Sequence, residues 1–126
     1  MRTKGNGLVQ KSPPPTIVLV ANGEHLARLV DVFPFSNAHG ERLGFAYEIQ
    51  AGPDAGAILL QSAACSASPT SKLAMIVRDL LGREPTEDEL AQGIGRELVG
   101  VSCRITAREE HNRAGTKYSA VNSVTR

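Results

Sequence analysis

The segment Leu98–Val124 constrains the fold of this chain most strongly, because it predicts two strands joined by a polar loop. Apolar and polar residues alternate over Val101–Arg108, which is the period of a strand with one buried face. The loop Glu109–Gly115 (EEHNRAG) then turns the chain. The returning strand, Lys117–Val124, breaks strict alternation, which indicates a bulge. The segment therefore predicts a hairpin.

Three further strands are predicted before this hairpin. Their ranges are His25–Phe33, Arg42–Gln50 and Ala57–Ser62. The second has the cleanest period-two pattern, and we expect its aromatic residues, Phe45 and Tyr47, on the buried face. Pro34 is expected to end or bend the first strand, because proline cannot donate a main-chain hydrogen bond.

An amphipathic helix is predicted between the third strand and the hairpin. Its apolar stripe consists of Leu73, Ile76, Val77, Leu80 and Leu81. Ser68 before Pro69 suits the start of this helix, and Gly82 suits its end. A second, shorter helix is expected to begin at Thr86, where Glu89 completes a capping box.

Five strands with one main helix between the third and the fourth predict an all-β fold, namely a five-stranded OB-like Greek-key barrel. The alternative is an α+β sheet with the helix packed across it. A length of 126 residues, 41% of them hydrophobic, fits a single domain over residues 16–126. Residues 1–15 carry three basic residues and no acid, which predicts a flexible basic tail.

No residue pattern in the sequence indicates a catalytic or cofactor-binding site. The histidines, His25, His39 and His111, have no motif-like neighbours that would make one of them the base of a nucleophile. Neither the Gly93-Ile94-Gly95 segment nor any other stretch matches a phosphate-binding loop. We therefore predict a protein that is not an enzyme and has no cofactor.

The cysteines and acidic residues predict no metal site. Cys65 and Cys103 lack CxxC spacing, which argues against a zinc site or a disulfide framework, and Cys103 lies on the apolar face of its strand. The run Glu109–His111 offers carboxylates and an imidazole but no further ligand pair. The sequence also lacks a secretory signal and a membrane-length apolar run, so we expect a cytoplasmic protein without membrane contact.

Charge is uneven along the chain, although the net charge is only +1. Acidic residues gather in residues 84–97, and basic residues gather in the predicted hairpin. We define the basic hairpin as four residues that are expected to contact phosphates: Arg104, Arg108, Arg113 and Lys117. The candidates for stacking a base are Phe33, Phe35, Tyr47 and Tyr118. Phe35 is the best of them, because Pro34 detaches it from the regular strand.

The segments GEHLARLVDV, RLGFAYEI, SPTSKL and LVGVSCRIT, followed by GTKYSAVNSV, resemble a diffuse group of small proteins of phages and mobile elements. These proteins are similar to replication and recombination accessory proteins with an OB-like fold, some of which are regarded as single-strand DNA binders. The resemblance covers roughly residues 22–125. It implies a phage or mobile-element accessory protein whose partner is single-stranded DNA.

A second hypothesis is a protein-binding inhibitor or adaptor, for instance a phage-encoded blocker of a host defence complex. The basic hairpin or the acidic segment 84–97 would then contact a host or phage protein. Both hypotheses are compatible with a homo-oligomer.

Overall fold

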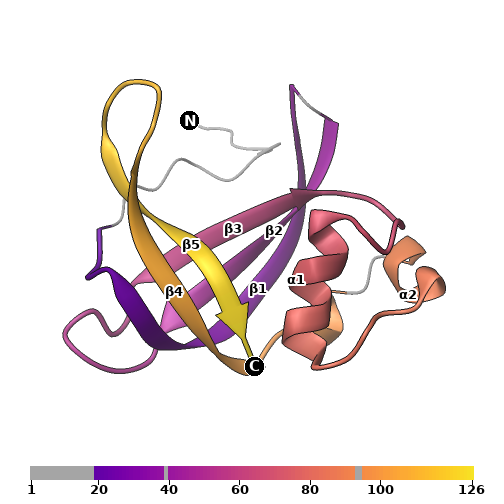
Figure 1. Cartoon of the computed structure of the whole chain (residues 1–126), viewed down its shortest axis with the longest axis horizontal. Helices are drawn as coiled ribbons and strands as arrows, with labels where there is room; N and C mark the ends of the chain where they lie inside the picture. The colour runs from indigo at the N-terminus through magenta and orange to yellow at the C-terminus, as the bar shows by residue number, and fades with distance from the viewer. Residues whose placement is uncertain (1–18, 39, 93–94) are drawn as a thin grey trace, which may run out of the picture.

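The structure, a computed structural model, describes residues 19–38, 40–92 and 95–126 and is mostly β (Figure 1). The predicted tail, residues 1–15, lies outside the described residues, as do His39 and Gly93. The elements are β1 (Gly23–Asn37), β2 (Gly40–Ile49), β3 (Ile58–Ala64), α1 (Lys72–Leu81), α2 (Glu87–Ala91), the 3-10 helix η1 (Arg96–Leu98), β4 (Ser102–His111) and β5 (Lys117–Thr125).

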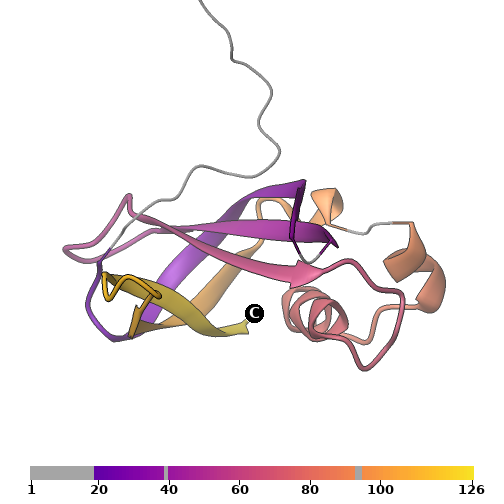
Figure 2. The same ribbon diagram turned by 90° about the horizontal axis from the view of Figure 1, so that it is seen from above.

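The five strands form one antiparallel sheet in the order β3-β2-β1-β4-β5. β1 lies at the centre: β4 pairs with its first part, from Gly23 to Arg28, and β2 pairs with its later part, from Ala27 to Asn37. The two parts overlap at Ala27 and Arg28, and a bulge between Leu29 and Asp31 in the pairing with β2 follows directly. Because β1 serves two partners in succession, the β4–β5 hairpin folds over the layer of β1, β2 and β3 (Figure 2).

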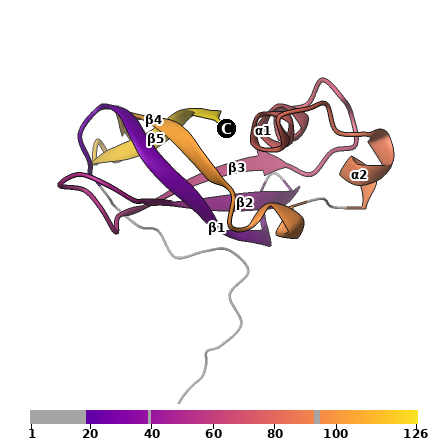
Figure 3. The same ribbon diagram turned by 90° about the horizontal axis from the view of Figure 1, so that it is seen from below.

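β3 and β5 are the edge strands, and no ladder joins them in the described part of the chain. The predicted barrel is therefore not closed by main-chain hydrogen bonds. Helix α1 packs against both edges and lies on the same side of the sheet as the β4–β5 hairpin (Figure 3). The helix accordingly covers the seam at which a closed barrel would have paired strands. The predicted alternative, an α+β sheet with a packed helix, has this arrangement of one sheet and one packed helix in common with the structure.

Pro34 does not end β1, which was one of the two outcomes predicted for it. The strand continues to Asn37, and Pro34 pairs with Leu43 of β2. β4 pairs only with residues up to Arg28 of β1, so the later part of β1 has a partner on one side alone. A proline is tolerated there because its missing N–H can face the unpaired side.

The core lies between the sheet and α1. Its fully buried large side chains are Tyr47, Phe45, Leu29, Ile49, Leu59, Leu80, Ile105 and Val77. The predicted burial of Phe45 and Tyr47 is thus confirmed. The Tyr47 hydroxyl donates a hydrogen bond to Gln61 Oε1 at 2.9 Å, and burial raises the pKa of this hydroxyl well above its usual range. This bond satisfies the polar end of the largest buried side chain.

The predicted core position of Cys103 is also confirmed. Its side chain is buried, and desolvation raises the pKa of its thiol to about 11. A buried thiol with a raised pKa is protonated near neutral pH and is a poor nucleophile. Both cysteines are free, and Cys65 is exposed.

The helices follow the predicted pattern except at one end. Helix α1 begins after Ser71, whose hydroxyl accepts a hydrogen bond from the Ala74 N–H at 3.1 Å. The predicted cap, Ser68, instead accepts from Ser71 through its carbonyl, because residues 68–71 form a turn before the helix. Gly82 ends α1 with a left-handed backbone, as predicted. No helix in the described residues is long and apolar enough to span a bilayer.

The β4–β5 hairpin is longer than predicted. β4 continues to His111, so the loop shortens to residues 112–116, and Asn112 Oδ1 accepts hydrogen bonds from the Ala114 and Thr116 N–H groups. These bonds hold the tight turn that lets both strands extend. The predicted bulge is confirmed, because the β4–β5 register shifts between Thr106 and Ala107.

We expect Leu80→Ala to lower the free energy of unfolding by about 2–5 kcal/mol, the usual cost of a cavity at a buried leucine. Leu80 is fully buried on the face of α1 that covers the seam. Met75→Ala is the matched control, because Met75 lies on the same helix and is 49% exposed. Urea unfolding should place the control within about 0.5 kcal/mol of the wild type. Equal losses in the two variants would contradict this packing of α1.

Candidate nucleic-acid interface

Two aromatic side chains lie together on the outer face of β1. The rings of Phe33 and Phe35 have their centroids 5.9 Å apart with a 35° angle between their planes, and both are half-buried. Their orientation depends on the β1 bulge. Without it, Phe33 would share the face of Leu29, which is buried, because alternate residues of a strand point the same way. The bulge shifts this alternation, so that Val32 points inward and Phe33 outward.

The neighbouring strands complete a mixed surface around these rings. Gly44 lies opposite Phe33 and Arg42 lies opposite Phe35 on β2, while β3 places Ser62 beside Gly44. Arg42 Nη2 donates a hydrogen bond to Ser62 Oγ at 3.2 Å. We call this surface the aromatic face; its residues are Phe33, Phe35, Arg42, Gly44, Leu60 and Ser62. It combines stacking surface with a positive charge.

The aromatic face contains an open pocket of about 150 Å³. Its lining residues are Phe33, Phe35, Gly44, Leu60, Gln61 and Ser62. Leu60 is 37% exposed, and Ile58, two residues earlier on β3, is 41% exposed. The pocket therefore lies in a surface that is apolar toward β3 and aromatic toward β1.

The predicted phosphate contacts differ in how they are paired. Arg104 Nη1 lies 3.3 Å from Glu24 Oε1, and Lys117 Nζ lies 3.6 Å from Glu109 Oε2. Neither Arg108 nor Arg113 has an ion pair or a side-chain hydrogen bond among the described residues. Two of the four cations are thus partly neutralised, although exposed pairs of this kind are weak.

The structure does not bring Phe35 to the basic hairpin. Arg104 lies opposite Leu26 near the start of β1, whereas Phe35 lies nine residues farther along the same strand. At about 3.3 Å per residue this separation is roughly 30 Å along the strand. Phe35 and the basic hairpin are therefore two surfaces at opposite ends of β1. Tyr47, another stacking candidate, is buried and has no exposed ring.

Sequence reasoning missed Arg42, Gly44, Leu60 and Ser62 on the aromatic face. One signal was available: Gly44 interrupts an otherwise regular strand, and a glycine there often marks a close approach by another group. The outward direction of Leu60 could not be inferred, because an apolar residue in a short apolar strand fits either face.

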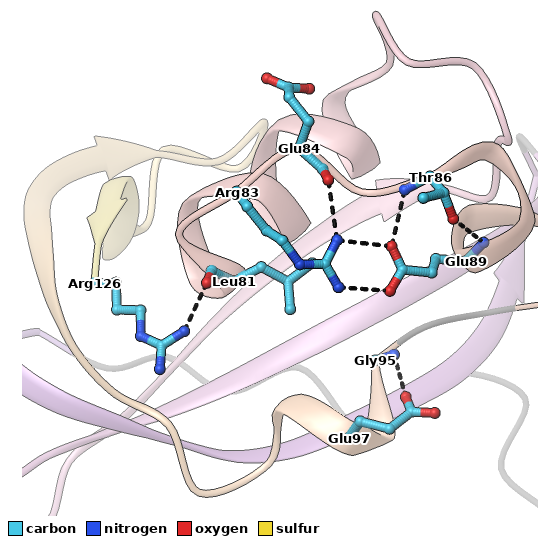
Figure 4. Close-up of polar contacts among 8 residues, drawn as sticks. All are labelled: Leu81, Arg83, Glu84, Thr86, Glu89, Gly95, Glu97 and Arg126. Atoms are coloured by element: carbon cyan, nitrogen blue, oxygen red, sulfur yellow. Dashed lines mark hydrogen bonds and ion pairs between the residues drawn. The ribbon is translucent and has the colours of Figure 1, made fainter.

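Another pocket, of about 280 Å³, lies beside the connection from α1 to α2. Its polar groups bond to one another (Figure 4). Arg83 donates to both carboxylate oxygens of Glu89, at 3.0 and 2.7 Å, and the Thr86 N–H donates to Glu89 Oε1 at 2.8 Å. Glu97, on the same pocket, accepts from the Gly95 N–H at 3.2 Å. Because the Glu89 and Glu97 carboxylates already accept these hydrogen bonds, we interpret the network as one that positions α2 and not as a ligand site.

The bonds to Glu89 lower the pKa of its carboxyl to about 2, mainly through the hydrogen bond from Arg83. The second cause is the main-chain N–H of Thr86, which closes the capping box that the sequence predicts. Residues 83–89, at the start of the acidic segment, are therefore held in a defined geometry.

Within residues 19–38, 40–92 and 95–126, no group of three or more potential metal ligands comes together. Neither a protein family nor any curated protein matches this chain in sequence.

Stability should depend on pH through Glu89. Its pKa is lower in the folded protein than its ordinary value of 4.5, so its contribution is fully present above about pH 4.5 and is lost as the pH falls toward about 2. In urea unfolding, the midpoint difference between the wild type and Glu89→Gln should therefore shrink across that window. Glu87→Gln is the control from the same helical turn. A difference that is independent of pH would contradict the role of this network.

Proposed function

We propose that this protein is a cytoplasmic accessory protein of a phage or mobile element that binds single-stranded DNA through an OB-like domain. The observation that carries the proposal is the pair of half-exposed rings, Phe33 and Phe35, beside the Arg42 guanidinium. Proteins that bind single strands without sequence preference combine such rings, on which bases stack, with cations that follow the backbone.

The strand arrangement supports the OB-like part of this proposal. An OB-fold is a five-stranded, partly open Greek-key barrel that binds oligonucleotides on one face. The order β3-β2-β1-β4-β5, with α1 between β3 and β4, is compatible with such a barrel left open at the seam between β3 and β5. The aromatic face spans β1, β2 and β3 and is not covered by α1, which packs against β3 and β5.

The charges support modest electrostatic affinity. Two arginines of the sheet have acidic partners: Arg28 lies 3.9 Å from Glu48, and Arg104 lies 3.3 Å from Glu24. Stacking on the aromatic face would therefore supply much of the binding free energy, while Arg108 and Arg113 add phosphate contacts.

One observation favours the second candidate, a protein-binding inhibitor or adaptor. Leu60 is an exposed apolar side chain on the pocket that the aromatic rings line, and Ile58, two residues earlier on β3, is exposed as well. Exposed apolar patches commonly mark protein interfaces. The sequence resemblance supports the phage or mobile-element origin. For such an origin, we expect the gene of this protein to lie beside a recombinase or primase gene.

Removal of one exposed ring should weaken DNA binding. We expect Phe35→Ala and Phe33→Ala each to cost about 1–3 kcal/mol of binding free energy for a labelled oligo-dT, the usual contribution of one stacked base. Fluorescence anisotropy measures this change. Val99→Ala, which truncates an exposed apolar residue on another part of the surface, is the control and should bind like the wild type. If the wild type binds no oligo-dT at any salt concentration, the protein-binding candidate replaces this proposal.

The unpaired arginines should determine part of the salt dependence. The double variant Arg108→Ala/Arg113→Ala is expected to reduce the slope of log K against log salt by about 1.4, because each phosphate contact with a single strand contributes about 0.7. The control is Arg96→Ala, which removes an exposed arginine of η1 outside both surfaces. Identical slopes in the wild type and the double variant would exclude the basic hairpin from the interface.

A further inference from the structure

The backbone conformation at Gly44 does not require a glycine. This residue lies inside β2, is buried, and is not among the glycines that adopt a positive φ angle. Glycine in the interior of a strand destabilises it relative to alanine, so a compensating role is expected. That role must come from what surrounds the residue.

The Phe33 ring supplies the reason. A Cβ atom at position 44 would lie 2.5 Å from both Cε2 and Cζ of Phe33 and 3.1 Å from its Cδ2. These distances are far below van der Waals contact, so the ring lies directly over the Gly44 backbone. Any side chain at this position would displace the ring. The absence of a side chain at Gly44 thus determines the position of the Phe33 ring in the aromatic face.

The Phe33 ring takes the space over Gly44, and a hollow remains beside the ring. Gly44 lies between Phe33 on β1 and the small Ser62 on β3, and this hollow, which both residues line, is the pocket of about 150 Å³ described above. Phe35 and Leu60 add further walls. The two rings already contact each other, with their centroids 5.9 Å apart, which is within the 4.5–7 Å range of aromatic pairs. A planar ligand would therefore stack from the side of the hollow and not between the rings.

We propose that the hollow beside the Phe33 ring is a subsite for one unpaired base, and that Gly44 is the positioning residue that holds Phe33 as its wall. This inference rests on the proposed single-stranded DNA binding and deepens it. Arg42 borders the subsite with one of its five N–H donors directed to Ser62, so further donors are available for the phosphate next to the bound base.

The test compares two labelled probes of equal length, oligo-dT and a fully abasic strand, in anisotropy titrations with the full chain. Gly44→Ala displaces the Phe33 ring that forms one wall of the hollow, and Ser62→Leu fills the hollow from β3. Each should weaken binding of oligo-dT by about 5- to 150-fold, which corresponds to one lost stacked base. Binding of the abasic strand and its salt slope should stay within about twofold of the wild type, because phosphate contacts remain.

Two further variants separate positioning from a general structural effect. In a Phe33→Ala background, Gly44→Ala should cause less than about a twofold additional loss, because the ring that the new methyl displaces is absent. Ser102→Leu adds the same side chain to an exposed position at the start of β4 and should leave oligo-dT binding unchanged. Circular dichroism establishes that each variant is folded. If Gly44→Ala does not fold, Ser62→Leu carries the test.

The outcomes distinguish this inference from the proposed function. Wild-type affinity for oligo-dT in Ser62→Leu and in a folded Gly44→Ala overturns the subsite while leaving DNA binding in place. A wild-type protein that binds both probes equally well also overturns it, because no base then contributes. A wild-type protein that binds neither probe overturns the proposed function and the subsite together.

Discussion

The bulge in β1 is the constraint on which the rest of the structure depends. Before it, β1 pairs with β4, and Leu29 continues this pairing through hydrogen bonds with the main chain of Val101 and Gly100. After it, β1 pairs with β2 alone up to Asn37. The extra residue changes which side chains point inward. The same strand therefore supplies Leu29 and Val32 to the core and Phe33 to the outer surface.

Because β1 has two partners in succession, the sheet folds over itself without closing. α1 then takes the place of the β3–β5 ladder that would close the barrel: its apolar stripe covers the seam between β3 and β5, and Leu80 and Val77 reach the fully buried core. The hydrogen bond from Tyr47 to Gln61 lies beneath this seam. At the C-terminal end of α1, Arg126 Nη1 donates to the Leu81 carbonyl at 2.6 Å and ties this end of the helix to the end of β5 (Figure 4).

The basic hairpin and the aromatic face are separated in this molecule. The basic hairpin lies toward one end of β1, and the aromatic face lies toward the other, beside the β1–β2 turn. The acidic segment is held by the bidentate Arg83–Glu89 pair and the capping box of α2, so its carboxylates are partly used in local structure. A ligand that used both Phe35 and Arg108 would have to run along the sheet.

The sequence by itself determined the elements, because their patterns are local. Alternation located β2, a polar loop located the β4–β5 turn, and Thr86 with Glu89 located α2 through a capping box. Tertiary structure alone decided how far β1 continues past Pro34, because a proline is tolerated only where the neighbouring strand is absent. It also decided that Phe33 points outward and that α1 covers an open seam. These outcomes depend on the β1 bulge and on strand pairing between distant residues, and neither leaves a periodic signal in the chain.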